Sequence, residues 1–357
     1  MKAVVYHGNK DIRYVTDWPE PEPRPGEVKL KVGYASICAT DIEEWQFGPR
    51  FVAMTPNPIT GKKAPLVLGH EVGGKVVKLG QGVTGLTVGD RVAVNDIINC
   101  HTCFWCRRGE YSACPNLAVM GFSADGGLAE YLAWPADHCI KLPASISDEE
   151  SSIVEPAAVA VHAARRARPE FGERAAVIGC GTVGLLTVQT LKAAGARVFA
   201  VDVRQSSLEL AQKLGADTTI DAGKEDAGAA LRKLTDGIGP DIVVETAGVA
   251  QTPIQAIQWV RRRGRVVLVG IYAARPNFDF LDIVDGEKTV IGSLAANPQD
   301  FTGAVELMAA GKVNAKPLVS ARIPLERTIV DGFERMLKPQ KDVYRILVGS
   351  GSVSGGR

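Results

Sequence analysis

The sequence predicts an α/β protein with two domains, a β-rich one followed by one built on a doubly wound parallel sheet. Three observations favour this fold class. The chain has 357 residues, more than a single hydrophobic core usually holds. Short apolar segments broken by glycine and proline fill its opening third. After about Glu155, apolar runs of strand length alternate with helix-length segments, which is typical of a parallel α/β domain.

The β-rich part begins with a predicted strand at residues 27–32. Val28, Leu30 and Val32 alternate there with charged residues, and this is the period of a half-buried strand. Glycine-punctuated segments follow at 73–80 and 89–94 and indicate further short strands joined by turns. We therefore expect a compact, barrel-like domain.

The second part shows the expected alternation of strands and helices. A short apolar run precedes a mostly apolar helix, and further strand-length runs follow it. The predicted strands are 175–178, 197–201, 241–245 and 265–270, and the helix is 183–194.

Composition and charge exclude several classes of protein. With 41 basic and 40 acidic residues and no long run of either sign, the chain lacks the basic surface typical of nucleic-acid binding. The longest uncharged stretch, residues 175–191, is interrupted by glycines and does not resemble a membrane span. The N-terminus lacks the apolar core of a secretory signal, so a cytoplasmic location is expected.

The segment from Gly179 to Gly184 reads G-x-G-x-x-G and lies between a predicted strand and a predicted helix. In that context the glycines allow a tight turn, close approach of a pyrophosphate, and close packing of helix on strand. Asp202 ends the next strand, where a carboxylate accepts hydrogen bonds from an adenosine ribose and disfavours a 2′-phosphate, which favours NAD over NADP. Arg204 either helps to admit a phosphate or is a solvated loop residue. The predicted cofactor residues are Gly179, Gly181, Thr182, Val183, Gly184, Asp202, Arg204 and Gly270.

Four cysteines follow the spacing C-x2-C-x2-C-x7-C in a lobe of about residues 95–115. They are Cys100, Cys103, Cys106 and Cys114. Four thiolates so close together can close a tetrahedral structural zinc site. An iron–sulfur cluster uses the same ligands and is the main alternative, and a loop of reduced cysteines is the other. The total of seven cysteines argues against complete disulfide pairing.

Further metal ligands are separated along the chain. The candidates are Cys38, the pair His70 and Glu71, and Glu155. Each has an ordinary structural explanation, since a lone cysteine is usually core and an early helical glutamate suits a helix N-terminus. Spacing alone does not decide between these explanations.

Together these residues resemble the zinc-dependent medium-chain alcohol dehydrogenases over essentially the whole chain. The matching motifs occur in the family's order: residues 38–41, 69–71, the four-cysteine lobe, 154–156 and 179–184. Residues 48–51 and 58–65, with His162 after the motif at 154–156, look most like the butanediol and polyol (sorbitol-like) dehydrogenase branch.

The resemblance implies a GroES-like catalytic domain at residues 1–154, a Rossmann NAD-binding domain at 155–293, and a return to the catalytic domain at 294–357 with a mobile tail from about 350. It implies a catalytic zinc held by Cys38 and His70. Glu155 is then a third ligand or a neighbour through water, and Glu71 either ligates or stays behind the metal. With the cysteine lobe, this gives two zinc ions per subunit.

The resemblance also assigns roles around the metal. Thr40 takes the substrate's hydroxyl proton, Asp41 orients a zinc ligand, and Arg345 reaches the cofactor pyrophosphate. Family members commonly carry a histidine five positions after the first zinc cysteine, as the end of the proton relay, but this chain has Glu43 there. We therefore expect Glu43 to be the proton acceptor in its place.

The expected function is hydride transfer between NAD and a secondary alcohol, vicinal diol or polyol. An L-threonine 3-dehydrogenase is the alternative among enzymes, and a non-catalytic cofactor-binding protein is the alternative from another class. Trp45, Phe47 and Phe51 either line an apolar wall of the substrate pocket or cover the core or a subunit contact. The resemblance implies a homotetramer or homodimer.

Overall fold

The computed structural model describes residues 1–272, 277–338 and 343–350. Their contacts define two compact units, one of Met1–Glu155 with the chain from Leu318 onward, the other of Pro156–Pro317. The mobile tail predicted from about residue 350 lies, beyond Ser350, outside the described residues. No helix in the described part of the chain is long and apolar enough to cross a membrane.

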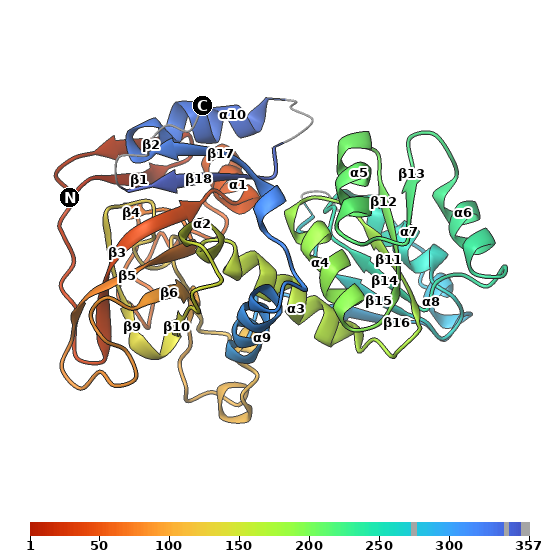
Figure 1. The fold of residues 1–357 in the computed structure, drawn as a ribbon, viewed down its shortest axis with the longest axis horizontal. Coiled ribbons are helices and arrows are strands. Elements are labelled where there is room, and N and C mark those ends of the chain that lie inside the picture. Colours follow the sequence, from red (N-terminus) through yellow and green to blue (C-terminus); the bar gives the residue numbers. More distant parts are fainter. Residues whose placement is uncertain (273–276, 339–342, 351–357) are drawn as a thin grey trace. The chain divides into compact units, whose positions relative to one another are not determined.

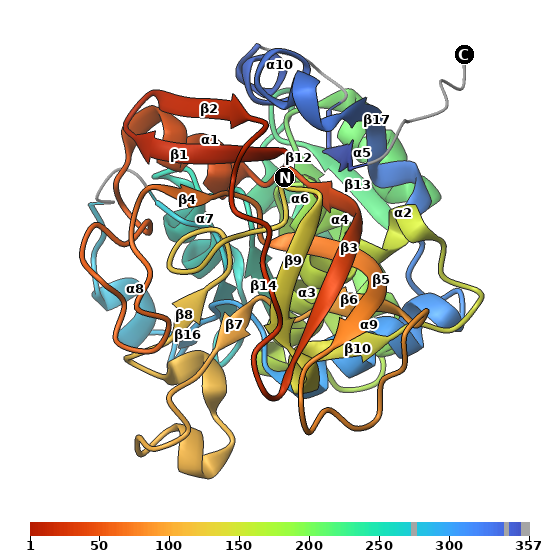
Figure 2. The same ribbon diagram turned by 90° about the vertical axis from the view of Figure 1, so that its left-hand side faces the viewer.

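The first unit is β-rich (Figures 1 and 2). A three-stranded sheet has the order β2-β1-β4, and a seven-stranded sheet has the order β10-β6-β5-β3-β18-β17 with β9 also paired to β3. Figure 2 shows β9, β3, β5 and β6 side by side. The strands are β1 (Ala3–Gly8), β2 (Asp11–Val15), β3 (Glu27–Ser36), β4 (Leu66–Val67), β5 (Glu71–Leu79), β6 (Arg91–Val94), β7 (Ile97–Ile98), β8 (Ala118–Val119), β9 (Tyr131–Pro135), β10 (Cys139–Lys141), β17 (Val319–Pro324) and β18 (Arg345–Gly349).

Helices in this unit are few and short. They are α1 (Ala39–Phe47), α2 (Asp148–Ser151) and α10 (Glu334–Leu337), and α3 (Val154–Ala167) begins in this unit and continues in the other. The returning strand β18 pairs with the end of β3. This pairing brings the beginning of β18 next to the segment that starts α1.

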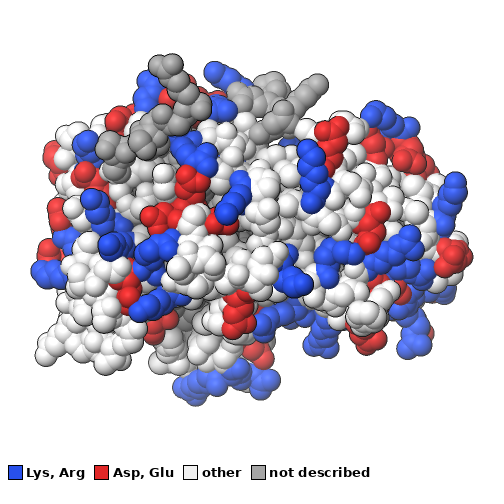
Figure 3. Space-filling view, viewed as in Figure 1, with Lys and Arg blue, Asp and Glu red and all other residues white. Residues whose placement is uncertain are grey.

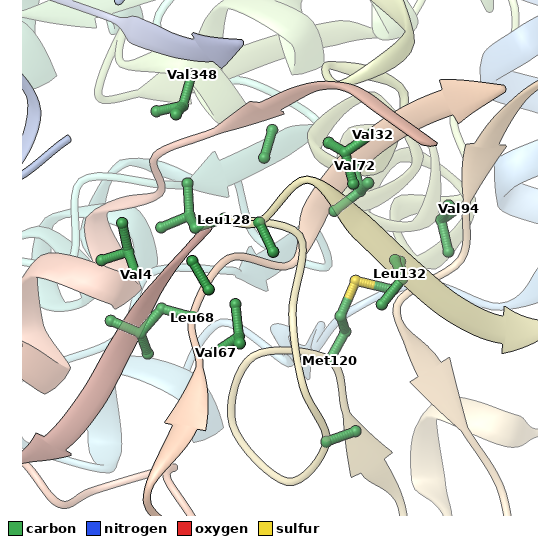
Figure 4. Close-up of a cluster of buried hydrophobic side chains, with 14 of the residues drawn as sticks. Val4, Val32, Val67, Leu68, Val72, Val94, Met120, Leu128, Leu132 and Val348 are labelled. Carbon is green, nitrogen blue, oxygen red and sulfur yellow. The ribbon is translucent and has the colours of Figure 1, made fainter. Parts of the chain in front are cut away.

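The core of the first unit lies between these sheets. Val4, Val32, Leu128, Leu132 and Val348 are almost fully buried, and Figure 4 shows them in one cluster drawn from several strands. The predicted alternation in β3 is confirmed at Val28, Leu30 and Val32. Lys29 departs from it because it is buried against the carboxylates of Glu20 and Glu22.

The second unit is a six-stranded sheet of order β13-β12-β11-β14-β15-β16 in which every pair is parallel. Its strands are β11 (Arg174–Ile178), β12 (Arg197–Asp202), β13 (Thr218–Asp221), β14 (Ile242–Glu245), β15 (Arg265–Leu268) and β16 (Thr289–Gly292). Its helices are α4 (Thr182–Ala193), α5 (Gln205–Lys213), α6 (Ala227–Leu234), α7 (Thr252–Trp259), α8 (Leu281–Val284) and α9 (Pro298–Ala309). The predicted α/β fold with a doubly wound sheet is confirmed.

The strand order reverses between β11 and β14. Right-handed crossovers then put α4 and α5 on one face and α6, α7 and α8 on the other, as Figure 1 shows. Apolar side chains of α6 and α7 pack on one face of the strands with Phe199 and Val243. The carboxyl ends of β11 and β14 therefore flank the switch point where such sheets bind ligands.

The chain returns to the first unit later than the expected residue 294. Residues 294–317 group with the second unit, and the return begins at Leu318. Two contacts explain this. His162 in α3 binds Asp300 in the first turn of α9, and the Gln189 side chain in α4 binds both backbone groups of Asn314.

Charged side chains of both signs are interspersed over the face shown in Figure 3. This agrees with the balanced composition, 41 basic and 40 acidic residues. It gives no support to a nucleic-acid partner.

Candidate catalytic centre, cysteine lobe and cofactor site

Three of the four separated metal-ligand candidates, Cys38, His70 and Glu71, converge in the first unit, and Glu155 is not part of this group. Cys38 is the N-cap of α1, and His70 and Glu71 stand where β5 begins. The ligand atoms of Cys38, His70 and Glu71 all lie within 4.8 Å of one another. The convergence follows from the sheet, because Ser36 near the end of β3 is paired with Glu71.

The Asp41 carboxylate contacts both Cys38 and His70. Its Oδ2 accepts from the backbone N–H of Cys38 at 2.9 Å, and its Oδ1 lies 3.4 Å from Nδ1 of His70. Burial would lower the pKa of His70, but the Asp41 carboxylate and the Cys38 sulfur outweigh it and raise the pKa well above its ordinary value. Asp41 therefore has the geometry of an orienting residue.

Glu71 is fully buried and both of its oxygens are engaged. Ser36 Oγ donates to Oε2, and Arg345 Nη2 donates to Oε1 at 2.7 Å. Burial raises the pKa of Glu71, and the Arg345 guanidinium opposes that rise. Arg345 also lies 4.0 Å from Cys38 Sγ. The expected position of Arg345 is at the cofactor pyrophosphate, and its contacts with the metal-ligand candidates have no signal in the sequence.

Two more carboxyl groups are buried beside this cluster. Burial, with the Asp96 carboxylate as the next cause, raises the pKa of Glu155 well above its ordinary value. Burial likewise raises the pKa of Asp96 to about 6, and His70 opposes the rise. Asp96 was not among the predicted site residues. Asp96 belongs to no motif and is far in sequence from Cys38 and Glu155. The sequence therefore contained no signal for it.

These residues suit a resident zinc ion. A thiol, an imidazole and carboxylates are its usual protein ligands. Here the imidazole and the carboxylates are buried beside half-buried Cys38, and Arg345 is the arginine that lies against them. His70 Nδ1 and Asp41 Oδ1 are buried without a full hydrogen bond. The electrostatics agree, because nearby buried carboxyl groups resist ionisation unless a cation compensates them.

Thr40 and Glu43 both stand on α1 near Cys38. Thr40 Oγ1 lies 3.7 Å from Cys38 Sγ. Glu43 Oε2 lies 3.7 Å from Nη1 of Arg50 and is buried without a hydrogen bond. Burial raises the pKa of Glu43, and Arg50 opposes the rise. Neighbouring Glu44 has a structural role, since its carboxylate caps the backbone N–H groups of residues 50–52.

The aromatic residues predicted near the site divide between core and surface. Trp45 packs edge-on against Phe333 at 5.7 Å and belongs to the core, whereas Phe47 is 81% exposed. Phe51 lies 6.1 Å from Phe122, whose ring lies 5.0 Å from His70. Phe51 and Phe122 therefore give the His70 side of the cluster an apolar flank.

The four clustered cysteines form a compact lobe that projects from the first unit (Figure 2). The sulfur of Cys100 lies 3.9 Å from Cys106 and 3.5 Å from Cys114, and Cys103 lies 3.9 Å from Cys114. A tetrahedron with zinc–sulfur bonds of about 2.3 Å has edges of about 3.8 Å, whereas a disulfide needs about 2.0 Å. The sulfur atoms thus have the spacing of a closed metal site.

The geometry of the glycine motif in the second unit is compatible with the three predicted roles. Gly179 has φ +90°, and a side chain there would lie 2.8 Å from Ala247 N. Gly181, the N-cap of α4, faces open space, so a ligand can approach the backbone. A side chain at Gly184 would meet the Gly179 carbonyl at 1.8 Å, so helix and strand need glycine to pack. A pyrophosphate at the α4 N-terminus fits this cradle.

Asp202 ends β12 and its carboxylate organises the same loop. Oδ2 accepts from Cys180 N at 2.6 Å and Oδ1 from Arg204 N at 2.8 Å. The Arg204 guanidinium lies 3.4 Å from Asp202 and also donates to the Cys180 carbonyl. Arg204 is therefore paired with Asp202, and its side chain remains 35% exposed. The carboxylate keeps acceptor sites for ribose hydroxyls, since it offers about four.

Glu245 at the end of β14 was not among the predicted site residues. Its Oε1 accepts from Ala247 N at 2.7 Å, Gly248 N at 2.9 Å and Thr252 Oγ1 at 2.7 Å. Tyr272 donates to Oε2. Predicted Gly270 packs directly on this carboxylate, because a side chain there would lie 2.5 Å from Oε2. Glu245 thus fixes the loops after β14 and β15 beside the glycine motif.

Comparisons with known proteins agree with both units. A family described as an alcohol dehydrogenase GroES-like domain matches residues 24–144, and one described as a zinc-binding dehydrogenase matches residues 182–310. The (R,R)-butanediol dehydrogenase of Bacillus subtilis is 36% identical over 351 residues, 98% of this chain and 99% of that protein. A sorbitol dehydrogenase of Gallus gallus is 37% identical over 339 residues, 93% and 92% of the two chains.

Solved structures give the same result. The crystal structure of 2R,3R-butanediol dehydrogenase from Bacillus subtilis matches with a TM-score of 0.91 at 36% identity, covering 98% of this chain and 99% of that one. An Escherichia coli alcohol dehydrogenase holding NADH matches at 0.87 and 26% identity, covering 98% and 99%. A Sinorhizobium meliloti dehydrogenase holding NADP matches at 0.87 and 30% identity, covering 98% of each chain. The chain belongs to the zinc-dependent medium-chain dehydrogenases, in the branch of the butanediol and sorbitol dehydrogenases.

Proposed function

We propose that this enzyme oxidises a secondary alcohol, vicinal diol or polyol to the carbonyl compound with NAD, at a zinc held by Cys38, His70 and one carboxylate. One observation carries the proposal: the ligand atoms of half-buried Cys38 and of buried His70 and Glu71 all lie within 4.8 Å of one another. The substrate class rests on the butanediol and sorbitol dehydrogenases that the chain resembles. Among the residues that the structure describes, no feature of the site favours the threonine alternative.

The bound zinc supplies Lewis acidity that lowers the pKa of an alcohol hydroxyl, and NAD supplies the hydride acceptor. The chain's own residues then handle binding and the proton. We propose that Thr40 accepts the hydroxyl proton and that Glu43 receives it at the end of the relay. The position of Thr40, 3.7 Å from Cys38 Sγ, supports the first step. Asp202 supports NAD over NADP because its carboxylate would repel a 2′-phosphate.

The four-cysteine lobe is proposed to hold a second, structural zinc. Its sulfur spacing of 3.5–3.9 Å supports a closed tetrahedral site. The contact of Arg345 with the cofactor pyrophosphate stays a prediction. Assembly as a homotetramer or homodimer is also a prediction, and light scattering tests it.

Metal analysis combined with a substrate panel tests the proposal. The enzyme is expected to hold two zinc ions per chain and to reduce NAD with butanediol or sorbitol more efficiently than with threonine. Cys38→Ser is expected to lose one zinc and the activity while still binding NAD. Cys139→Ser is the matched control, since Cys139 is a buried cysteine outside the cluster. Full zinc content and turnover in Cys38→Ser would overturn the assignment.

A further inference from the structure

A pocket in the Pro156–Pro317 unit is lined by four arginines. It has a volume of about 460 Å³, and Arg165, Arg166, Arg168 and Arg265 contribute to its wall together with His162 and Asp300. We propose that this pocket binds a small organic phosphate, at a site separate from the cofactor site.

The position of the pocket separates it from the cofactor crevice. Arg265 and Thr289, which both line it, are the first residues of β15 and β16. The glycine motif and Asp202 lie instead at the carboxyl ends of β11 and β12. Since all these strands are parallel, the two sites lie at opposite edges of one sheet.

The acidic side chain in the pocket wall does not neutralise the four arginines. Asp300 is fully buried, and its carboxylate is occupied by His162 Nδ1 at 2.8 Å, Arg165 Nε at 3.0 Å and the backbone N–H of Asn297 at 2.9 Å. It therefore compensates Arg165 and caps α9. Arg265 is paired with Glu173 through Nη2 alone.

Guanidinium donors remain available in the pocket. Among the described residues, the Arg168 side chain has no hydrogen bond or ion pair, and Arg166 donates to the Gly292 carbonyl at 3.2 Å without a carboxylate partner. Arg265 Nε is buried without a partner. Arg166 and Arg168 are exposed, so their guanidinium groups are free to turn toward a bound anion, whereas the buried Arg265 Nε–H would gain an acceptor from it.

A phosphate matches this donor set best. Guanidinium groups bind phosphate through paired N–H donors, with charge-assisted bonds stronger than neutral ones. The pocket volume of about 460 Å³ is typical of small organic ligands and exceeds what a bare phosphate fills, so we assign an organic phosphate.

Calorimetric titration of the zinc-loaded, NADH-saturated enzyme tests this site, because NADH blocks the cofactor pyrophosphate position. The probes are phosphoglycolate, which has no alcohol group for the catalytic site, and inorganic phosphate. Saturable one-to-one binding of phosphoglycolate, tighter than that of phosphate, is expected. Equal affinities would show that the pocket holds a phosphate alone and overturn the organic ligand.

Paired variants identify the pocket as the binding site. Arg166→Gln with Arg168→Gln is expected to weaken phosphoglycolate binding by roughly tenfold or more, given the usual strength of charged hydrogen bonds. The control, Arg262→Gln with Arg263→Gln, removes an exposed arginine pair that is bound to Asp285 and Glu287, and it should bind as the wild type does. Absence of saturable binding, unchanged affinity in the pocket variant, or an equal loss in the control would each refute the proposal.

Discussion

Replacing Glu245 should lower both the stability of the second unit and its affinity for NAD. The carboxylate accepts the backbone N–H groups of Ala247 and Gly248, at 2.7 and 2.9 Å. The same loop lies against the glycine motif, since Thr246 Oγ1 donates to the Gly179 carbonyl at 2.8 Å. Loss of the carboxylate therefore frees the loop that packs against the glycine motif, where the pyrophosphate is proposed to bind.

The magnitude follows from the donors that lose their acceptor. In Glu245→Ala two backbone N–H groups are left without a partner, at about 1–3 kcal/mol each, so we expect a loss of about 2–6 kcal/mol. Each kcal/mol lowers the melting temperature of a domain of this size by about 2–4 °C. Glu245→Gln keeps an acceptor and loses only the charge, so a smaller loss of about 1–3 kcal/mol is expected.

Thermal unfolding and NAD titration, the latter well below the melting temperature, measure the two effects. Glu245→Ala should melt at least about 4 °C lower and bind NAD more weakly. Thr252→Val is the control, because Thr252 bonds the same oxygen at 2.7 Å without being part of the loop, and it should keep the NAD affinity. If Glu245→Ala melts and binds NAD as the wild type does, the reasoning fails.

Three further predictions concern the other sites. Cys106→Ser should lower the zinc content from two to one per chain and lower the melting temperature, because the closed lobe depends on its metal; unchanged zinc content in metal analysis would contradict a structural zinc. Glu43→Gln should flatten the acidic limb of the pH–rate profile for alcohol oxidation. The pKa of Glu43 is raised, so its carboxyl group stays protonated, and unable to accept a proton, to a higher pH than usual. Wild-type activity should therefore fall as the pH drops through that pKa. An unaltered profile would make Glu43 a bystander. Gly184→Ala should destabilise the second unit by about 1–3 kcal/mol, since its side chain would meet the Gly179 carbonyl at 1.8 Å. Gly181 faces open space, so Gly181→Ala should melt as the wild type does and bind NAD more weakly. Equal melting temperatures of the two variants would refute the distinction.

Local patterns in the sequence predict most of the fold. The alternation at residues 27–32 and the apolar runs around Ala175 and Val198 each reflect one element's own burial, so they can be read without the tertiary structure. The glycine motif is also local, because the turn, the helix N-terminus and the packing contact lie within residues 179–184. The four cysteines are local for the same reason.

Contacts between distant residues could not be predicted in this way. Arg345 binds Glu71 from 274 positions away, and no spacing rule connects β18 with β5. Asp96 and Glu245 carry no motif, and their roles depend on which groups the strands bring close. The return point at Leu318 likewise depends on the contact of His162 with Asp300, which ties α9 to the second unit.

The same contacts bear on which carboxylate completes the catalytic zinc site. Glu71 lies within 4.8 Å of Cys38 and His70, but both of its oxygens already accept hydrogen bonds, from Ser36 and Arg345. The buried Glu155 has no cationic partner of this kind among the described residues, and burial and neighbouring carboxylates raise its pKa. A bound cation would relieve that cost directly.

We therefore predict that Glu155 ligates the zinc and that Glu71 with Arg345 supports it from behind. Glu155→Gln should lose the catalytic zinc and the activity, because an uncharged amide is a weaker ligand than a carboxylate. Glu71→Gln should retain that zinc and lose part of the turnover, since it keeps an acceptor for one donor but leaves the Arg345 charge uncompensated. Zinc analysis of the two variants compares them directly. Loss of zinc from Glu71→Gln with full retention in Glu155→Gln would reverse the assignment and make Glu71 the ligand.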